Sequence, residues 1–157
     1  PRMKAGDIIE EGLKSLKPGM SKNERASIVI KTLGMVGLGP ETAGRYPHEF
    51  SGGQRQRIGI ARSIAVEPEF LICDEATSSL DVSVHAQILN LLKAIQRKFS
   101  LSFLFITHDL AIVEYMADEV AVMFEGKIVE RGTVEEIFSR PAHPYTKKLL
   151  ASVPRIE

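Results

Sequence analysis

The sequence has 157 residues, of which 44% are hydrophobic and 25% are charged, a composition typical of a globular protein with its own core. Twenty basic residues balance twenty acidic residues, so bulk charge gives no reason to expect nucleic acid or anionic lipid as a partner. The single cysteine, Cys73, excludes an internal disulfide and a metal cluster built from cysteines, and no apolar run is long enough to predict a membrane span.

The first fifty residues are predicted to contain two helices and no strand. The first helix covers 7–17, with Asp7 as its cap. The second begins at a capping box of Ser21 and Glu24 and ends at Gly37, and a connector rich in Gly and Pro follows. The apolar stripe of this second helix is expected to consist of Ala26, Val29, Ile30, Leu33 and Val36.

The stretch "YPHEFSGGQRQRIGIARS" (46–63) places two adjacent glycines at the expected start of a third helix. Ser51 can cap this helix, whose unpaired N–H groups and positive dipole end attract phosphate. Gly52 and Gly53 would let an anion approach the backbone, and the Gln54 amide could reach a phosphate or a ribose. Taken alone, the same pattern indicates only a capped helix start. The arginines of this helix are expected on a solvated or ion-paired face: Arg55, Arg57 and Arg62.

Two short apolar runs are predicted to be parallel strands buried on both faces. "FLIC" (70–73) leads into Asp74 and Glu75, and "SFLFIT" (102–107) leads into His108. Ligands of open α/β sheets bind beyond the carboxyl ends of the strands. We therefore expect two carboxylates and an imidazole to share one edge of the sheet.

An amphipathic helix between these strands, capped by Asp81 or Ser83, would complete a βαβ unit with a right-handed crossover. The fold class predicted from this pattern is α/β. Further along the chain we predict a helix over 109–117, a hairpin that turns at Glu125-Gly126, and a helix that begins at a capping box of Thr133 and Glu136.

The polar residues after the two strands suggest phosphate chemistry. Asp74 suits Mg²⁺, which proteins hold through one or two carboxylates together with phosphate oxygens. Glu75 could orient or deprotonate a water that attacks a phosphate, and His108 could donate a hydrogen bond to the departing phosphoryl group. Any one of these residues alone is better explained as the polar end of a buried strand.

Four motifs of the sequence together are more specific for a protein family than any one of them alone. In order and spacing, "SGGQ", "FLICDE", "SSLD" and "ITHD" resemble the motifs of the ATP-binding subunits of ABC transporters. This resemblance implies ATP and Mg²⁺ as cofactors, Ser51–Gln54 as the signature motif and Asp74 as the magnesium ligand. It also implies Glu75 as the catalytic carboxylate, His108 as the switch histidine and Asp81 at a dimer interface.

Longer stretches, among them "PRMKAGDIIEEGL" and "HPYTKKLLASVP", resemble the oligopeptide/dipeptide importer branch, and nickel importers share much of the pattern. The resemblance implies a helical signature subdomain over 1–66, the C-terminal part of a RecA-like ATP-binding core over 67–131, and a helical extension over 132–157. Its implied partners are a second ATP-binding subunit, identical or different, transmembrane permease subunits and, indirectly, an extracytoplasmic peptide-binding protein. The implied location is peripheral, on the cytoplasmic face of the membrane.

Two family motifs do not occur in the sequence. No G-x-x-x-x-G-K-[ST] loop is present in the 157 residues, and the glutamine loop is also missing. We therefore expect a C-terminal portion of an import ATPase that hydrolyses no ATP by itself, and whose signature motif closes on a nucleotide held mainly by the partner subunit. The alternatives are a non-hydrolytic regulatory or docking module, and an ATPase of DNA repair or translation. That last class predicts zinc cysteines, a coiled-coil insertion or a basic surface, which the sequence lacks.

Overall fold

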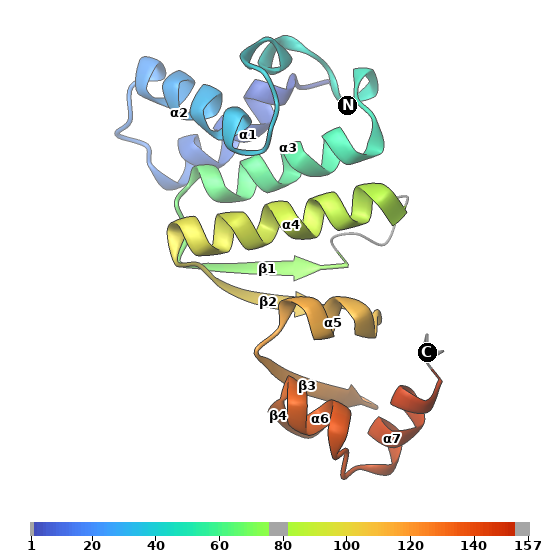
Figure 1. Cartoon of the computed structure of the whole chain (residues 1–157). Coiled ribbons are helices and arrows are strands. Elements are labelled where there is room, and N and C mark those ends of the chain that lie inside the picture. Colours follow the sequence, from blue (N-terminus) through green and yellow to red (C-terminus); the bar gives the residue numbers. More distant parts are fainter. Residues whose placement is uncertain (1, 76–81, 153–157) are drawn as a thin grey trace. The chain divides into compact units, whose positions relative to one another are not determined.

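The computed structural model describes residues 2–75 and 82–152, so Asp81 and the "SSLD" segment lie outside the described residues. The chain forms two compact units, Pro1–Leu104 and Phe105–Glu157, called here the first unit and the second unit. The predicted α/β class is confirmed, since helices accompany a sheet in which β1 and β2 run in the same direction (Figure 1). The division at residues 66 and 131 stays a prediction.

The first unit is mainly helical. In chain order it contains α1 (Ala5–Leu16), α2 (Lys22–Met35), the short 3₁₀ helices η1 (Pro40–Gly44) and η2 (Pro47–Glu49), α3 (Gly52–Ala65), β1 (Phe70–Asp74) and α4 (Val82–Phe99), and it shares β2 (Ser102–Ile106) with the second unit. The predicted connector therefore holds two helical turns. Helix α4 begins at Val82, so Ser83 lies within it, and Asp81, the other predicted cap, is outside the described residues.

Helix α3 is the centre of the first unit, because it contacts α1, α2 and α4. Its buried side chains are those of Ile58, Ile60, Ala61, Ile64 and Ala65, and all but Ile60 follow the spacing of one helix face. The predicted stripe of α2 is only partly buried. Val29, Leu33 and Val36 belong to the core, whereas Ala26 and Ile30 are exposed within the described part of the chain.

The helix ends follow local hydrogen-bonding rules. The predicted capping box is confirmed: Glu24 N–H donates to Ser21 Oγ at 3.3 Å, and Ser21 N–H donates to Glu24 Oε2 at 2.8 Å. Gly37 ends α2 with a φ of +74°, the left-handed conformation that glycine adopts at low cost. The prediction that Asp7 caps α1 is wrong. Lys4 is the cap residue, and the Asp7 carboxylate accepts its N–H from inside the first turn.

The sheet of β1 and β2 is not buried on both faces, so that prediction is wrong as well. Along β1, Cys73 is buried and Leu71 is half-buried, whereas Phe70 is 53% and Ile72 is 60% exposed. Successive side chains of a strand point to opposite faces, so only one face of this sheet is covered in the described part of the chain. Leu104 and Ile106 of β2 are exposed in the same way.

The second unit is built around a hairpin. Its elements are α5 (Leu110–Met116), β3 (Glu119–Phe124), β4 (Lys127–Thr133), α6 (Val134–Ser139) and α7 (Pro144–Ala151). The strands pair antiparallel and turn at Glu125 (φ 47°) and Gly126 (φ 75°), as predicted, and two successive positive φ values are typical of a tight hairpin turn. The predicted capping box is confirmed, with Glu136 N–H donating to Thr133 Oγ1 at 3.2 Å. Within residues 2–75 and 82–152, no helix is both long and apolar enough to cross a membrane.

A carboxylate of β4 binds the chain just before the last helix, whose cap residue is His143. Glu130 accepts the N–H of Ala142 at 2.6 Å and that of His143 at 3.0 Å, just before α7 begins. The nearby hydroxyl of Thr146 is the largest cause of a lowered pKa of Glu130, and these N–H groups lower it further. The Thr146 hydroxyl itself does not reach full hydrogen-bond geometry with any described residue. We therefore assign the attachment of this segment to the bonds that Glu130 accepts from the Ala142 and His143 N–H groups.

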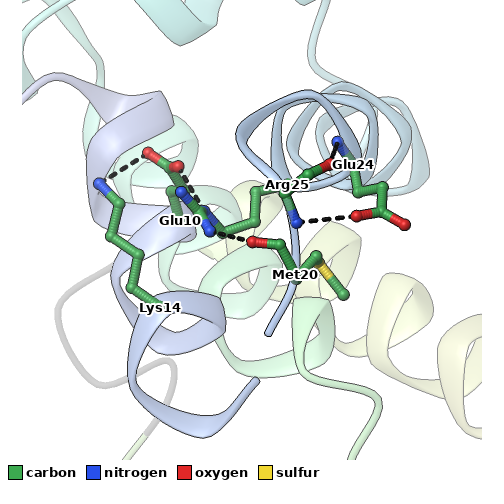
Figure 2. A network of polar contacts seen from close by, with 6 residues as sticks. Glu10, Lys14, Met20, Glu24 and Arg25 are labelled. Atoms are coloured by element: carbon green, nitrogen blue, oxygen red, sulfur yellow. Dashed lines mark hydrogen bonds and ion pairs between the residues drawn. The ribbon is translucent and has the colours of Figure 1, made fainter. Parts of the chain in front are cut away.

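A polar network joins α1 to α2 (Figure 2). The Glu10 carboxylate accepts from Arg25 Nε at 2.8 Å and from Lys14 Nζ at 2.9 Å, and the Arg25 guanidinium also donates to the Met20 carbonyl. The side chains of Glu10 and Arg25 are only 16% and 17% exposed. Hydrogen bonds from Arg25 and then Lys14 lower the pKa of Glu10, so the network requires the ionised carboxylate.

We expect Glu10→Gln to lower the free energy of unfolding of the chain by about 2 kcal/mol, because it removes a charge-assisted hydrogen bond shielded from solvent. Thermal unfolding at pH 7 measures this change. The matched control is Glu11→Gln, since Glu11 pairs with Arg62 at 3.3 Å but both side chains are more than half exposed. The control should change stability by less than about 0.5 kcal/mol. Equal losses in the two variants would contradict the assigned role of Glu10.

We expect the attachment of α7 to weaken at acid pH. The pKa of Glu130 is lower in the folded chain than its unfolded value of 4.5. The stabilisation that Glu130 gives is therefore complete above pH 4.5 and is lost as the pH falls through the folded pKa. Hydrogen exchange of the Ala142 and His143 amides should report this loss, and Glu130→Gln should cause it at pH 7. Glu114→Gln, which removes an exposed charge from α5, is the control and should leave both amides protected.

Candidate functional site

The first candidate feature is the N-terminus of α3, where Ser51 is the cap residue. Gln54 N–H donates to Ser51 Oγ at 3.3 Å, and Ser51 N–H donates to Gln54 Oε1 at 3.0 Å. Both side chains that the sequence assigns to an anion are therefore engaged in a capping box. Each keeps donors for a further partner, since the Ser51 hydroxyl still has its proton and the Gln54 amide its NH₂ group.

The first turn of α3 also has the electrostatic properties of an anion site. Ser51 and Gly52 are exposed, and no acidic residue lies in the turn. The N–H groups of Gly52 and Gly53 have no acceptor within the helix, because the first amides of any α-helix lack one. With the dipole of a 14-residue helix behind them, these groups can bind an oxyanion from solvent.

Gly53 has a role that the sequence did not predict. A Cβ atom at this position would lie 2.6 Å from Cγ1 of Val84, a residue of α4. Real contacts do not reach this distance, so a side chain here would displace α4 or Val84. Gly53 therefore lets α4 pack against the first turn of α3, independently of any anion.

The three arginines of α3 do not share one environment. Arg55 is exposed, and Arg62 forms an exposed ion pair with Glu11, as predicted for a solvated or ion-paired face. Arg57 differs, and the prediction is wrong for it. Its guanidinium donates to the carbonyl of Val36 at 2.7 Å and to Oε1 of Gln87 at 3.4 Å.

The second candidate feature is the end of β1. Asp74 is its last residue, Glu75 follows directly, and both are exposed. Glu75 has a φ of 45°, a left-handed conformation that is uncommon for a residue with a side chain. Burial raises the pKa of the neighbouring Cys73 thiol to about 11, so this thiol is protonated at neutral pH and acts as a small apolar side chain.

The third candidate feature is the loop between β2 and α5, which contains His108. The strand ends at Ile106, one residue earlier than predicted, so Thr107 separates it from His108. Thr107 Oγ1 accepts the N–H of Asp109 at 3.0 Å, and Asp109 Oδ1 accepts the N–H of Ala111 at 2.9 Å. These bonds fix the backbone on both sides of His108. These two bonds were not predicted from the sequence, although Thr and Asp are common in such local turns.

The structure brings some of the predicted residues together. Ser51, Gly52, Gly53 and Gln54 form one helix start, and Asp74 is adjacent to Glu75 in the chain. The predicted meeting of these carboxylates with His108 stays a prediction, since His108 belongs to the second unit. No group of three or more His, Cys, Asp or Glu side chains in the described ranges could hold a metal ion. A single carboxylate such as Asp74 still fits Mg²⁺, which takes its other ligands from phosphate and water.

Comparison with known proteins gives two family matches. Residues 1–78 match the family "ABC transporter", and residues 129–157 match "Oligopeptide/dipeptide transporter, C-terminal region". The chain is 54% identical over 154 residues to the oligopeptide transport ATP-binding protein OppF of Bacillus subtilis, and this match covers 98% of the chain and 50% of the relative. It is 52% identical over 153 residues to the dipeptide transport ATP-binding protein DppF of Lactococcus lactis, covering 98% and 49%. The chain thus spans about half the length of the curated relatives it matches.

We expect Gly53→Ala to lower the free energy of unfolding by about 1–3 kcal/mol, the usual cost of overpacking a tight contact. Gly59→Ala is the matched control on the same helix. A Cβ there would meet no atom within 4 Å, so this variant should gain up to about 1 kcal/mol from the better helix propensity of alanine. Thermal unfolding measures both changes. If both substitutions stabilise the chain, the close approach of Val84 to Gly53 is wrong.

Proposed function

Because the chain belongs to the ABC transporter family, we propose that it is part of the ATP-binding subunit of a peptide importer, which hydrolyses ATP to drive uptake. The observation that carries this proposal is the match of residues 129–157 to the C-terminal region of oligopeptide/dipeptide transporters, together with the relatives of those names. These names favour peptides over nickel as the substrate.

In this proposal, Ser51–Gln54 contacts the phosphates of a nucleotide held mainly by a second ATP-binding subunit. The exposed first turn of α3, its unpaired N–H groups and the absence of acidic residues in that turn support this role. Backbone N–H groups stabilise phosphate charge without taking or giving protons. The segment therefore supplies binding and charge stabilisation, and the reacting groups must lie elsewhere.

We assign those groups to the ends of the two parallel strands. Asp74 would hold Mg²⁺, which neutralises phosphate charge when it is bound. Glu75 would accept a proton from the attacking water, and His108 would donate a hydrogen bond to the terminal phosphate. The exposure of Asp74 and Glu75 and the fixed backbone around His108 support these roles.

The proposed partners are those that the resemblance to the ATP-binding subunits of peptide importers implies. They are a second ATP-binding subunit, identical or different, and permease subunits in the membrane, with a peptide-binding protein outside the membrane as an indirect partner. Asp81 is proposed to lie at the interface between the two ATP-binding subunits. The protein would then act at the cytoplasmic face of the membrane without inserting into it.

The test is ATP hydrolysis by the complete protein assembled with its partner subunit. We expect Glu75→Gln to lower kcat about 100-fold or more, because it removes the group that accepts the proton, while ATP binding is retained. Phosphate release measures kcat, and a fluorescent ATP analogue measures binding.

The matched control is Glu69→Gln, which removes another exposed carboxylate from the chain just before β1. This variant should hydrolyse ATP at the wild-type rate. A wild-type complex without Mg²⁺-dependent hydrolysis would contradict the proposed function. Equal rates in wild type and Glu75→Gln would contradict only the role of Glu75.

A further inference from the structure

Arg57 connects three helices of the first unit. From α3, its guanidinium donates to the carbonyl of Val36 at 2.7 Å and to Gln87 Oε1 at 3.4 Å. Val36 is the cap residue at the C-terminus of α2, where unpaired carbonyls and the negative dipole end favour a cation. Gln87 belongs to α4. One side chain therefore joins α3 to α2 and to α4.

The backbone beside this contact is adapted to it. Gly37, directly after Val36, has a φ of +74°, and a Cβ atom there would lie 3.1 Å from Arg57 Nη1. The guanidinium therefore occupies the space next to the turn that ends α2. The two acceptors are bonded by different nitrogens of its planar group, a fixed geometry that the single nitrogen of a lysine does not reproduce.

The Arg57 contact and the Gly53 contact act on the same part of α3. Val84 of α4 lies against Gly53 of α3. One helical turn further along each helix, Gln87 of α4 accepts a hydrogen bond from Arg57 of α3. One contact is close packing and the other is a hydrogen bond, and both connect the first turns of α3 to α4. The amides of Gly52 and Gly53 lie in those turns.

We propose that Arg57 is a positioning residue that fixes the direction of the N–H groups of Ser51–Gln54. This inference rests on the proposed function, in which those groups meet the phosphates of a nucleotide. Arg57 does not contact the nucleotide in this account, because its guanidinium is already bonded to Val36 and Gln87. Preorganised donors lose much of their effect when they are displaced by about 1 Å, so loss of Arg57 should reduce the rate of hydrolysis.

The experiment compares Arg57→Met with Arg57→Lys in the complete protein assembled with its partner subunit. We expect Arg57→Met to lower kcat about tenfold or more with little change in KM for ATP, since the groups that hold most of the nucleotide are untouched. Arg57→Lys can still donate to the Val36 carbonyl, so it should recover part of the rate. Gln87→Ala should lower kcat less than Arg57→Met, because Arg57 then keeps its shorter bond.

Two controls separate positioning from simple destabilisation. Arg62→Met removes an arginine of the same helix whose ion pair is exposed, and it should leave kcat unchanged. The double variant Arg57→Met, Gly59→Ala should regain thermal stability, because alanine at 59 favours the helix and touches nothing. The loss of kcat should persist in that stabilised background.

Hydrogen exchange adds a readout that needs no activity. In Arg57→Met the amides of Gln54 and Arg55, which donate to the hydroxyl and the carbonyl of Ser51, should exchange faster than in wild type, and in Arg62→Met they should not. The inference is overturned if these amides exchange equally in all variants, or if kcat recovers once stability is restored. A wild-type complex that lacks hydrolysis overturns the proposed function, and the exchange measurement still decides whether Arg57 positions the segment.

Discussion

The close packing of α3 against its neighbours is the constraint on which the first unit depends. Its buried apolar side chains fix the helix axis among α1, α2 and α4. Apolar packing of this kind leaves rotation and sliding less well defined, because many side-chain arrangements have similar energies. At the N-terminal end, the missing side chain of Gly53 and the bonds of Arg57 add the directional contacts that remove this freedom. The geometry of the candidate anion site therefore depends on how α3 packs within the first unit.

Charged residues act locally in this chain, whose formal net charge is zero. Glu10 receives Arg25 and joins α1 to α2, and Glu130 receives two backbone N–H groups and joins β4 to the start of α7. In each case an ionised carboxylate meets a donor of fixed geometry, the arrangement that makes a hydrogen bond strong. Bulk charge thus predicts little about this protein, whereas the position of single carboxylates explains how its elements are joined.

The sequence predicted those features whose causes lie within a few residues of each other. The capping boxes at Ser21 and Thr133 and the turn at Glu125-Gly126 depend only on neighbours in the chain, and all three are confirmed. Long-range contacts could not be predicted in this way. Gly53 meets Val84 and Arg57 meets Val36 only after the helices have packed. An apolar run also does not say how many faces of a strand are covered, which is why Phe70 and Ile72 were wrongly expected to be buried.

Among the proposed reacting residues, the backbone gives Glu75 the most specific support. In residues 2–75 and 82–152, four non-glycine residues have a positive φ. Two of them, Glu67 and Ser100, follow the ends of α3 and α4, and Glu125 forms the hairpin turn, so ordinary chain geometry accounts for all three. Glu75 instead follows a strand, where a left-handed residue costs about 1–2 kcal/mol and glycine would avoid that cost. Glu75 therefore stands where glycine would fit the backbone better. This is expected if the protein requires the carboxylate of Glu75 for function.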